Sequence, residues 1–476
     1  MKKLIASIIV LSILIVGCSD LDINRDPDSL NPSSAPLSSQ LPAGITGIIG
    51  AEGASLAIIG GMWSQYWTQS NAANQYKEID TYAIGTSDYN NIWNAMYDAL
   101  GDIRNVKRRA LNEGNWNYYL IATTLEVQAS QVLTDIYGDI PYTEANNINN
   151  LTPKFNTGVE VYDLMLNDLN IALSKNLSES KGETPGKDDL IFDGAMNNWV
   201  KLANTLKLKI YMRQTNSSRK AIAEAGITQL LNSGVQFLNI DAGMDQFTDA
   251  PDLSNPLYES NNRQLNTATN LRMSTTLASY FDSKVDPRKG KYYAVGNSLN
   301  QGDLNNPAGQ ATFAVVTLKP TTPAYLMTIE ESLLLQAEAL ERNNTSGKAL
   351  YDAAVNANFV RYALNGSAFV AAGGGYEYPS TGTFDQKLET IITQKWIASF
   401  PGNGFEAFLE TNRTGYPKTS ALYHDKPGYI AGQIVYSKAG ITNGLFPKRL
   451  VYPISERNAN PNTPVLVPIT TKIWWN

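Results

Sequence analysis

Apolar residues recur every three or four positions in several stretches of the chain, which is the spacing of an amphipathic helix. Three stretches show it most clearly: Ile121 to Ile136, Val161 to Leu173 and Trp199 to Ile210. Further helices are predicted over residues 88–111, 329–342, 348–364 and 384–400. Strand signals are short and scattered, as in residues 312–318 and 449–454. The pattern is therefore mainly helical.

This balance predicts a mostly α fold with long loops and minor β structure. Helices of this length can pair as hairpins that stack on one another, in a TPR-like way, although no clean repeat of about 34 residues is detectable. Polar stretches interrupt the helices at residues 176–194, 241–270 and 290–309. Loops of that length tend to be functional or disordered. No break in composition suggests a second domain, so residues 41–476 are predicted to form one.

The N-terminus has the layout of a secretory signal peptide. Met1-Lys2-Lys3 precedes an apolar run, Leu4 to Val16, which is shorter than the ~20 residues needed to span a bilayer. Ile15-Val16-Gly17-Cys18 resembles the bacterial lipobox, in which the cysteine is lipidated and the chain is cleaved before it. We therefore predict a signal peptide over residues 1–17, a lipid anchor on Cys18 and a flexible tether over residues 18–40.

Composition excludes several classes of function. Cys18 is the only cysteine, which excludes an intramolecular disulfide and a cysteine-based metal site. Removal of residues 1–17 takes away two lysines and no acids, so the net charge goes from −6 to −8. An acidic chain without a basic run is a poor binder of nucleic acid. Charged residues make up only 17%, and the abundant neutral polar side chains suit uncharged, hydroxyl-rich ligands.

Catalytic and metal motifs are weak in this sequence. The single histidine, His424, lies in a polar loop and is expected to face solvent, and one histidine cannot form a His-based zinc site. The acids between Asp241 and Asp252 do not have the spacing of a calcium loop. Neither Gly-x-Ser-x-Gly nor a P-loop is present. We predict a protein without a cofactor or metal that is not an enzyme, although two of its many carboxylates could serve a glycosidase.

Five separated segments carry motifs of one lipoprotein family. They are Ile136 to Tyr142, an aromatic-Gly-Asp-hydrophobic-Pro-Tyr turn; Trp199 to Lys209, which runs on to Arg213; Asp286-Pro287-Arg288; Ile329 to Ala339, which ends in Ala-Glu-Ala; and Glu389 to Phe400, followed by Glu406 and Asn412-Arg413. On these motifs, in order after a lipobox, the chain resembles the SusD/RagB family of Gram-negative outer-membrane lipoproteins. The ending Pro453 to Asn462 departs from the commonest SusD C-terminus and indicates a divergent SusD-like branch.

This resemblance implies a partner and a function. The family's members sit as lids over a SusC-like TonB-dependent barrel at the cell surface, so the expected role is to bind an extracellular nutrient, an oligosaccharide, and deliver it to that transporter. Peptide capture, as in the RagB branch, and a surface glycosidase are the alternatives. The motif residues themselves are expected to be structural: Gly138 as a helix cap, Pro141 in a turn, Trp199 in the core, and Asn204 and Glu338 as partners of buried backbone groups.

Candidate ligand residues are aromatic and amide side chains that lie close together in the sequence. Sugar rings stack their apolar faces on Trp and Tyr, and amides replace water at their hydroxyls. The stretch after the first long helix contributes part of the glycan site in SusD, which the resemblance carries over. We predict that the ligand contacts Trp67, Asn71, Asn74, Tyr76, Tyr82 and Tyr89, and, in a second loop, Tyr376 and Tyr378. Trp63 and Trp67, four residues apart, could instead pack within the fold.

Overall fold

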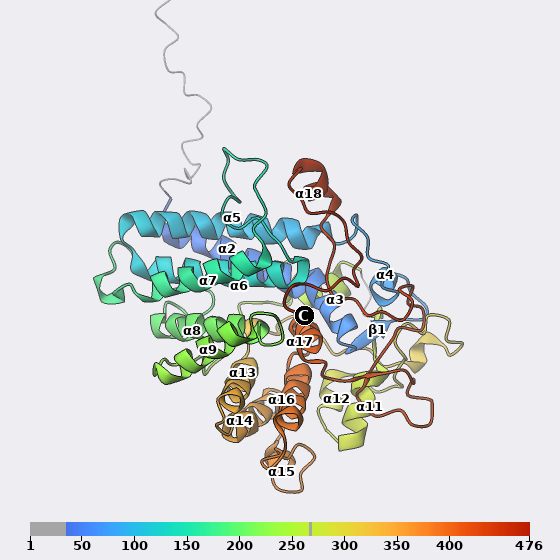
Figure 1. Cartoon of the computed structure of the whole chain (residues 1–476). Helices are drawn as coiled ribbons and strands as arrows, with labels where there is room; N and C mark the ends of the chain where they lie inside the picture. Colours follow the sequence, from blue (N-terminus) through green and yellow to red (C-terminus); the bar gives the residue numbers. More distant parts are fainter. Residues whose placement is uncertain (1–34, 266–268) are drawn as a thin grey trace, which may run out of the picture.

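The computed structural model describes residues 35–265 and 269–476 (Figure 1). The predicted signal peptide, Cys18 and most of the predicted tether lie outside the described residues. The first described helix, α2, already begins at Leu37, and the side chains of Leu37 and Leu41 are fully buried. The predicted tether boundary at residue 40 is therefore a few residues too late, because the chain is packed into the core from residue 37 onward.

Helices make up most of the regular structure. In chain order they are α2 (Leu37–Ala51), η1 (Glu52–Leu56), α3 (Ala57–Trp63), α4 (Lys77–Asp80), α5 (Asn90–Glu113), α6 (Trp116–Tyr137), α7 (Gly158–Leu173), η2 (Leu177–Glu179), α8 (Met196–Arg213), α9 (Lys220–Asn232), α10 (Pro256–Tyr258), η3 (Glu259–Arg263), α11 (Thr275–Lys284), α12 (Lys289–Tyr292), η4 (Gln310–Thr312), α13 (Ile329–Arg342), α14 (Lys348–Arg361), α15 (Ser367–Val370), α16 (Phe384–Ala398), α17 (Gly404–Thr414) and α18 (Ile454–Ala459). This confirms the mostly α prediction.

The long helices pack as stacked hairpins. Figure 1 shows α5, then α6 with α7, then α8 with α9, and then α13 with α14, one below another. Local signals set their ends: capping boxes begin α7 at Thr157 and α16 at Thr383, and Gly114 in a left-handed conformation ends α5. The predicted TPR-like stacking is therefore confirmed, and the loops between the hairpins and the C-terminal chain cover the side that Figure 1 shows at the right.

The β structure is confined to three two-stranded pairs among the described residues. β1 (Trp67–Gln69) pairs antiparallel with β3 (Leu271–Met273), β2 (Ala242–Met244) pairs antiparallel with β4 (Ala324–Met327), and β5 (Thr419–Ser420) pairs parallel with β6 (Ile434–Val435). The two predicted strands were wrong. Residues 312–318 make only isolated bridges, and residues 449–454 have no strand partner. From this irregular chain Phe313, Ala314, Val316, Leu450 and Tyr452 still reach the core.

The N-terminal helix is kinked. α2, η1 and α3 run on from one another, but η1 is a π-helical segment in which Ala54 has non-helical backbone angles (φ −96°, ψ −111°). Residues Leu37–Trp63 are long and apolar enough to span a membrane by length and composition alone. Most of this stretch is nevertheless buried by α5, α17 and other parts of the fold, as expected for a core helix.

A network of buried charges lies between the helices and contains charged residues from three of the five motif segments. Lys209 and Arg213 of α8 pair with Glu406 of α17 at 3.0 and 2.8 Å, and Arg213 also pairs with Asp135 of α6 at 3.0 Å. Lys395 of α16 pairs with Glu406 at 3.0 Å. These side chains are almost completely buried. Although burial opposes ionisation, Arg213, Lys209 and Lys395 together hold the pKa of Glu406 well below its usual range.

The network extends to α13 through Glu338. Its carboxylate pairs with Arg413 of α17 at 2.7 Å and with Arg342 at 2.8 Å. Glu338 therefore binds side chains, where the sequence had suggested backbone groups. Asn204 does bond a backbone group, the carbonyl of Gln236 at 3.3 Å, as predicted. Trp199 is fully buried, and Gly138 has a positive φ of 90° at the end of α6, so these two structural roles are also confirmed.

The last described residues close the core on the side of α6, α7 and α8. Trp475 is fully buried, and the Arg213 guanidinium lies 5.3 Å from the centre of its ring. Trp474 packs edge-on against Tyr162 of α7, with ring centres 4.8 Å apart. A methyl group at Gly158 would lie only 2.1 Å from the Trp474 indole nitrogen, so the start of α7 leaves room for this ring. Residues far apart in the sequence thus complete one packing unit.

Candidate functional site

The predicted ligand loop, residues 67–89, is more buried than expected. Trp67, Tyr76 and Tyr82 belong to the main core, and protein atoms cover nearly all of each ring. The Trp67 indole donates to the Ile58 carbonyl at 3.1 Å, and the Tyr82 hydroxyl accepts from the Ser437 amide at 3.3 Å. A ligand could stack on these three rings only if their faces were exposed, and the fold covers those faces. The segment has little regular structure, and its aromatic side chains pack into the core.

The other residues of this loop lie nearer the surface. Asn74 is exposed, whereas Asn71 and Tyr89 are half-buried. The Asn71 amide donates to the carbonyls of Asn306 and Ala308 at 2.9 and 2.8 Å, so it joins the loop to a distant polar stretch. The Tyr89 hydroxyl donates to Glu78. Of the ligand residues predicted in this loop, Asn71, Asn74 and Tyr89 therefore remain accessible.

The second predicted loop is also packed into the fold. Tyr376 and Tyr378 are buried in a smaller core formed with α13, α14 and α16. The Tyr376 hydroxyl donates to Asp286, and the Tyr378 hydroxyl donates to Glu341 at 2.8 Å. The structure does not bring these tyrosines together with the loop of residues 67–89, because the two sets belong to separate hydrophobic clusters.

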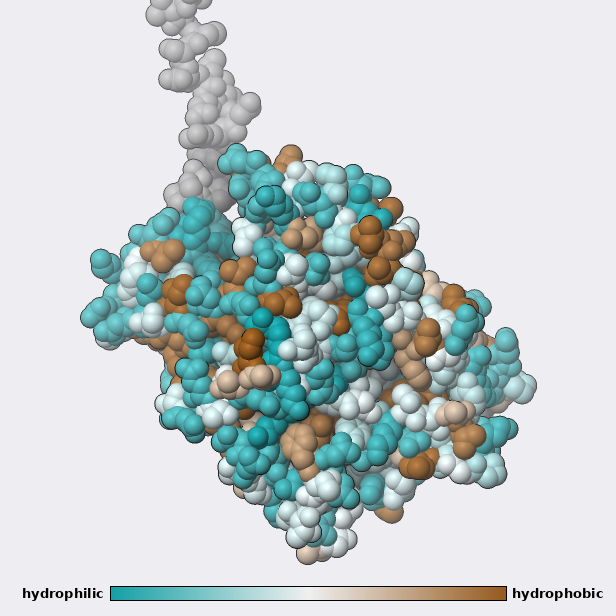
Figure 2. Space-filling view, in the orientation of Figure 1, coloured by the Kyte–Doolittle hydropathy of each residue, from teal (hydrophilic) through white to brown (hydrophobic). Residues whose placement is uncertain are grey.

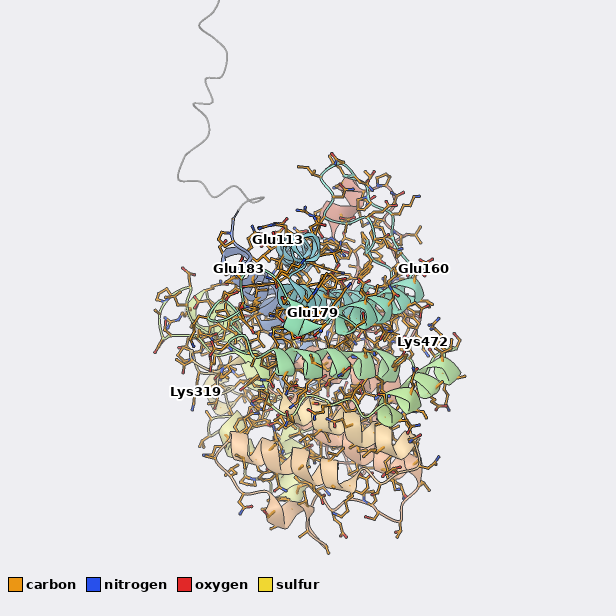
Figure 3. All side chains as sticks on the ribbon, turned by 90° about the vertical axis from the view of Figure 1, so that its left-hand side faces the viewer. Glu113, Glu160, Glu179, Glu183, Lys319 and Lys472 are labelled. Carbon is orange, nitrogen blue, oxygen red and sulfur yellow. The ribbon has the colours of Figure 1, made fainter. Side chains whose placement is uncertain are left out.

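A cavity opens beside the kink in the N-terminal helix. We call it the kink cavity; its volume is about 600 Å³, within the range of small-molecule sites. Its wall is drawn from Glu52 and Gly53 at the kink, Asn255 and Leu257 of α10, residues 317–325, the end of α14 and the connection between α16 and α17. Lys319 lies at its rim, and Figure 3 shows this lysine on the opposite side of the molecule from Lys472.

Aromatic rings line one wall of the kink cavity. They are Tyr325, Tyr362 and Phe400, with Pro323 and Pro401 beside them. Arg361 fixes this wall, because its guanidinium donates to the Tyr325 hydroxyl at 2.8 Å and to Asp241 at 2.8 Å, and also pairs with Glu330. Burial lowers the pKa of Arg361, but hydrogen bonds to Glu330 and Asp241 outweigh it, so the pKa is raised and the charge is kept. The arginine is thus fully engaged within the protein.

Glu52 contributes a neutral polar group to the same cavity. Its side chain is almost completely buried, and desolvation raises its pKa to about 8, even though the Gln128 amide donates to it at 3.1 Å. At neutral pH most molecules therefore carry a protonated Glu52, which can donate as well as accept a hydrogen bond. π-Helical segments such as η1 are frequent at functional sites. Here the segment sets Glu52 and Gly53 into the cavity wall.

Asn403 supplies an unused hydrogen-bonding group. It is only 8% exposed, and among the described residues its side-chain amide has no hydrogen-bond partner. Buried polar side chains in folded proteins are almost always bonded, so an unbonded amide in a cavity wall indicates a position for a ligand or water. Together the cavity offers aromatic faces, an amide and a protonated carboxyl, and each of these groups can contact a neutral ligand.

The sequence carries one signal for this cavity. Glu52 is the only charged residue between Leu37 and Trp63, and an isolated acid in an apolar helix must be buried or face a polar site. Asn403, Tyr325 and Arg361 come from three separate segments, so only the fold brings them together. Within residues 35–265 and 269–476 no group of three His, Cys, Asp or Glu side chains could hold a metal ion.

Comparison with known proteins assigns the family. A SusD-like family model, described as starch-binding and associating with the outer membrane, matches residues 38–453. The chain belongs to the SusD-like family. The family is associated with the outer membrane, and the motif segments named above all lie within the matched region. A search of curated proteins finds no match.

Solved structures of SusD homologues share the fold. A chitin-binding SusD homologue from Flavobacterium johnsoniae has a TM-score of 0.74 at 21% identity, covering 91% of this chain and 98% of that one. A SusD homologue from Bacteroides uniformis has a TM-score of 0.71 at 22% identity, covering 92% and 99%. One from Bacteroides thetaiotaomicron has a TM-score of 0.68 at 22% identity, covering 93% and 99%. The SusD-like architecture is thus retained at low identity over nearly the whole chain.

Proposed function

We propose that this SusD-like protein binds an extracellular oligosaccharide in the kink cavity and delivers it to a SusC-like TonB-dependent transporter. The observation that carries the proposal is the unbonded Asn403 amide beside the aromatic wall of Tyr325, Tyr362 and Phe400. Aromatic faces take the C–H faces of sugars, and a neutral amide and carboxyl take hydroxyls. The accessible loop residues Asn71, Asn74 and Tyr89 are proposed as further contacts for a longer chain.

Two features favour a neutral sugar over other ligands. The family description names starch, and one of the similar structures is described as chitin-binding. Among the described residues that line the cavity, the charged side chains without an ion-pair partner are Lys291 and Lys319, and both lie exposed at its rim. We further propose that the protein binds without hydrolysing its ligand. Peptide capture remains the main competing function, since amides and aromatic faces also bind peptides.

Titration of the protein with defined oligosaccharides tests the ligand. Maltotetraose, chitotetraose and a tetrapeptide of small neutral residues would be titrated into wild type and Asn403→Ala by calorimetry. We expect one sugar to bind and Asn403→Ala to weaken it by about tenfold, which corresponds to about 1.4 kcal/mol. Thermal stability should change little, since the amide makes no bond to lose. Binding of the peptide alone, or an unchanged sugar affinity in the variant, would contradict the proposal, and release of shorter sugars would indicate an enzyme.

The anchor and the partner are proposed from the lipobox and the family. Cys18→Ala should release the protein from membranes or leave its precursor uncleaved, provided that the cells lack the transporter. Membranes solubilised in mild detergent should yield the wild-type protein together with a barrel. Recovery of the protein alone would count against the lid arrangement. A Cys18→Ala variant that still fractionates with the outer membrane would contradict the lipid anchor.

A further inference from the structure

A second cavity lies between α11 and α16, away from the kink cavity. We call it the α11–α16 cavity; its volume is about 490 Å³. Its wall comes from Tyr280 and Lys284 of α11, the Tyr376 loop, residues 389–396 of α16 and residues 417–433. α16 passes both cavities, but the second is lined by residues up to Trp396 and the first by residues from Ala398 onward. They share no lining residue.

The base of this cavity is a rigid aromatic cluster. The rings of Tyr280 and Tyr376 are stacked, with centres 6.2 Å apart and planes 14° apart, and Trp396 meets Tyr280 edge-on at 6.0 Å. Each neighbour of Tyr280 is fixed elsewhere: the Trp396 indole donates to the Ser64 carbonyl at 2.8 Å, and the Tyr376 hydroxyl donates to Asp286. Such a preformed wall can bind a ligand without loss of side-chain freedom.

Gln394 provides the polar group that points to a ligand. It is 3% exposed and lines the cavity, yet its side-chain amide has no hydrogen-bond partner in the part of the chain that the structure describes. The Tyr280 hydroxyl in the same wall likewise has no partner there. Because the remaining exposed surface of Gln394 faces the cavity, a water molecule or a ligand group that enters the cavity can bond its amide.

The charges around the mouth of the cavity balance. Lys284 and Lys418 face Glu377 and Glu389, and the Lys418 and Glu389 side chains pair with each other at 3.2 Å. This balance disfavours a strongly charged ligand of either sign. Ile430, 62% exposed, adds an apolar edge at the rim.

The backbone at Gly432 keeps this wall close to the aromatic base. Gly432 has a φ of +85°, and a methyl group there would lie 2.6 Å from the Tyr280 ring, so only glycine permits the approach. The Gly432 amide donates to Ser279 at 3.2 Å, which ties residues 430–433 to α11. The cavity is therefore bounded by fixed chain on this side as well.

From the unbonded Gln394 amide, the fixed aromatic base and the balanced rim, we infer that the α11–α16 cavity is a second binding site for a neutral saccharide. This goes beyond the proposed function, which concerns the kink cavity alone. Two separate sites allow one protein to hold a glycan chain at two places, or to hold two chains at once. The gain in retention then comes from effective concentration, without any new contact within either site.

The experiment compares one variant for each cavity and a matched surface control. Wild type, Gln394→Ala, Asn403→Ala and Gln229→Ala, an exposed glutamine on α9, would be crystallised and soaked with maltotetraose or chitotetraose, and titrated with the same sugars. We expect sugar density beside Gln394 in the wild type, and about tenfold weaker binding at that site in Gln394→Ala, with Gln229→Ala unchanged. Thermal unfolding should be similar in all four proteins, because Gln394 makes no bond within the fold.

The outcomes separate this inference from the proposed function. If Asn403→Ala abolishes all sugar binding and Gln394→Ala changes nothing, the second site is overturned and the kink cavity stands. If Gln394→Ala alone removes binding, the α11–α16 site stands and the proposed site is overturned. Thr393→Trp, which would fill the cavity from its wall, should reproduce the effect of Gln394→Ala. Water alone beside Gln394 at saturating sugar would overturn the inference.

Discussion

At the residue scale, Glu52 combines an ionisable group with nearly complete burial. Desolvation raises its pKa to about 8, whereas the carboxyl of an unfolded chain titrates near 4.5. Between these two values the folded protein holds a proton that the unfolded protein has lost. The free energy of unfolding is therefore greatest, as far as this group is concerned, below about pH 4.5, and it falls as the pH rises towards 8.

Replacing Glu52 by Gln should remove this pH dependence. We expect wild type to lose about 2 kcal/mol of stability relative to Glu52→Gln between pH 6 and pH 8, since each pH unit in this window contributes up to ~1.4 kcal/mol. Urea unfolding at several pH values measures the difference. The amide has the same shape and can still bond Gln128, so the variant should fold normally. Parallel stability curves for the two proteins would show that Glu52 ionises as it does in water.

At the element scale, the kinked N-terminal helix contacts α17 through glycine. A methyl group at Gly60 of α3 would lie 2.0 Å from the backbone nitrogen of Phe405, whereas one at Gly50 of α2 would meet open space. Gly60→Ala should therefore destabilise the protein by about 1–3 kcal/mol, as overpacking does. Gly50→Ala is the matched control and should stabilise it by up to ~1 kcal/mol through helix propensity. Thermal unfolding of the two variants gives the comparison; equal shifts would contradict the close approach.

The sequence predicted some elements closely and others poorly for identifiable reasons. Residues 329–342 were predicted as a helix and form α13 over that same range, because Thr328 caps its start and the apolar stripe is unbroken. Trp63 and Trp67 are spaced like two residues on one face of a helix, but α3 ends at Trp63 and Trp67 begins β1. Periodicity over four residues cannot locate such a boundary, which depends on pairing with β3, some 200 residues later.

Site residues were harder to predict than elements. The residues next to Tyr76, Tyr82 and Tyr376 in the sequence include amides, glycines and other aromatics, which are also typical of a sugar site. A tyrosine can nevertheless be buried wherever its hydroxyl finds a partner, and Tyr82 and Tyr376 both find one. Composition alone therefore cannot distinguish a packed tyrosine from an exposed one. In the kink cavity the group that indicates a ligand is the Asn403 amide, which is left without a partner only once the chain has folded.

At the scale of the whole molecule, the buried charges join α6, α8, α13, α16 and α17. Arg213→Met should cost about 3–5 kcal/mol, because Asp135 and Glu406 would then be buried with too little positive charge. Arg213→Lys keeps the charge, but one ammonium cannot replace the three guanidinium nitrogens that contact Asp135, Glu406 and Glu410, so we expect an intermediate loss. The control is Lys187→Ala, whose exposed pair with Asp193 should contribute less than ~1 kcal/mol. Chemical denaturation measures all three, and a small loss in Arg213→Met would contradict a stabilising network.

The surface of the molecule contrasts with this charged interior. Figure 2 shows that hydrophilic residues cover most of the visible face and that hydrophobic residues form small separate groups. The ion pairs on this surface, such as Lys187 with Asp193 and Lys418 with Glu389, are open to solvent, in contrast to the buried network. The strongest electrostatic contacts therefore lie inside the helical stack, where salt screens them least.

The buried position of Trp475 has a consequence for biogenesis. This ring lies beside Arg213, so α6, α7 and α8 cannot complete their packing until the chain has been synthesised through residue 475. A nascent chain that is still emerging from the ribosome lacks this contact, and its buried charges lack a cover. Such a chain therefore lacks part of its core for as long as residue 475 has not been added. The contact that closes this side of the core is therefore among the last that a newly made chain can form.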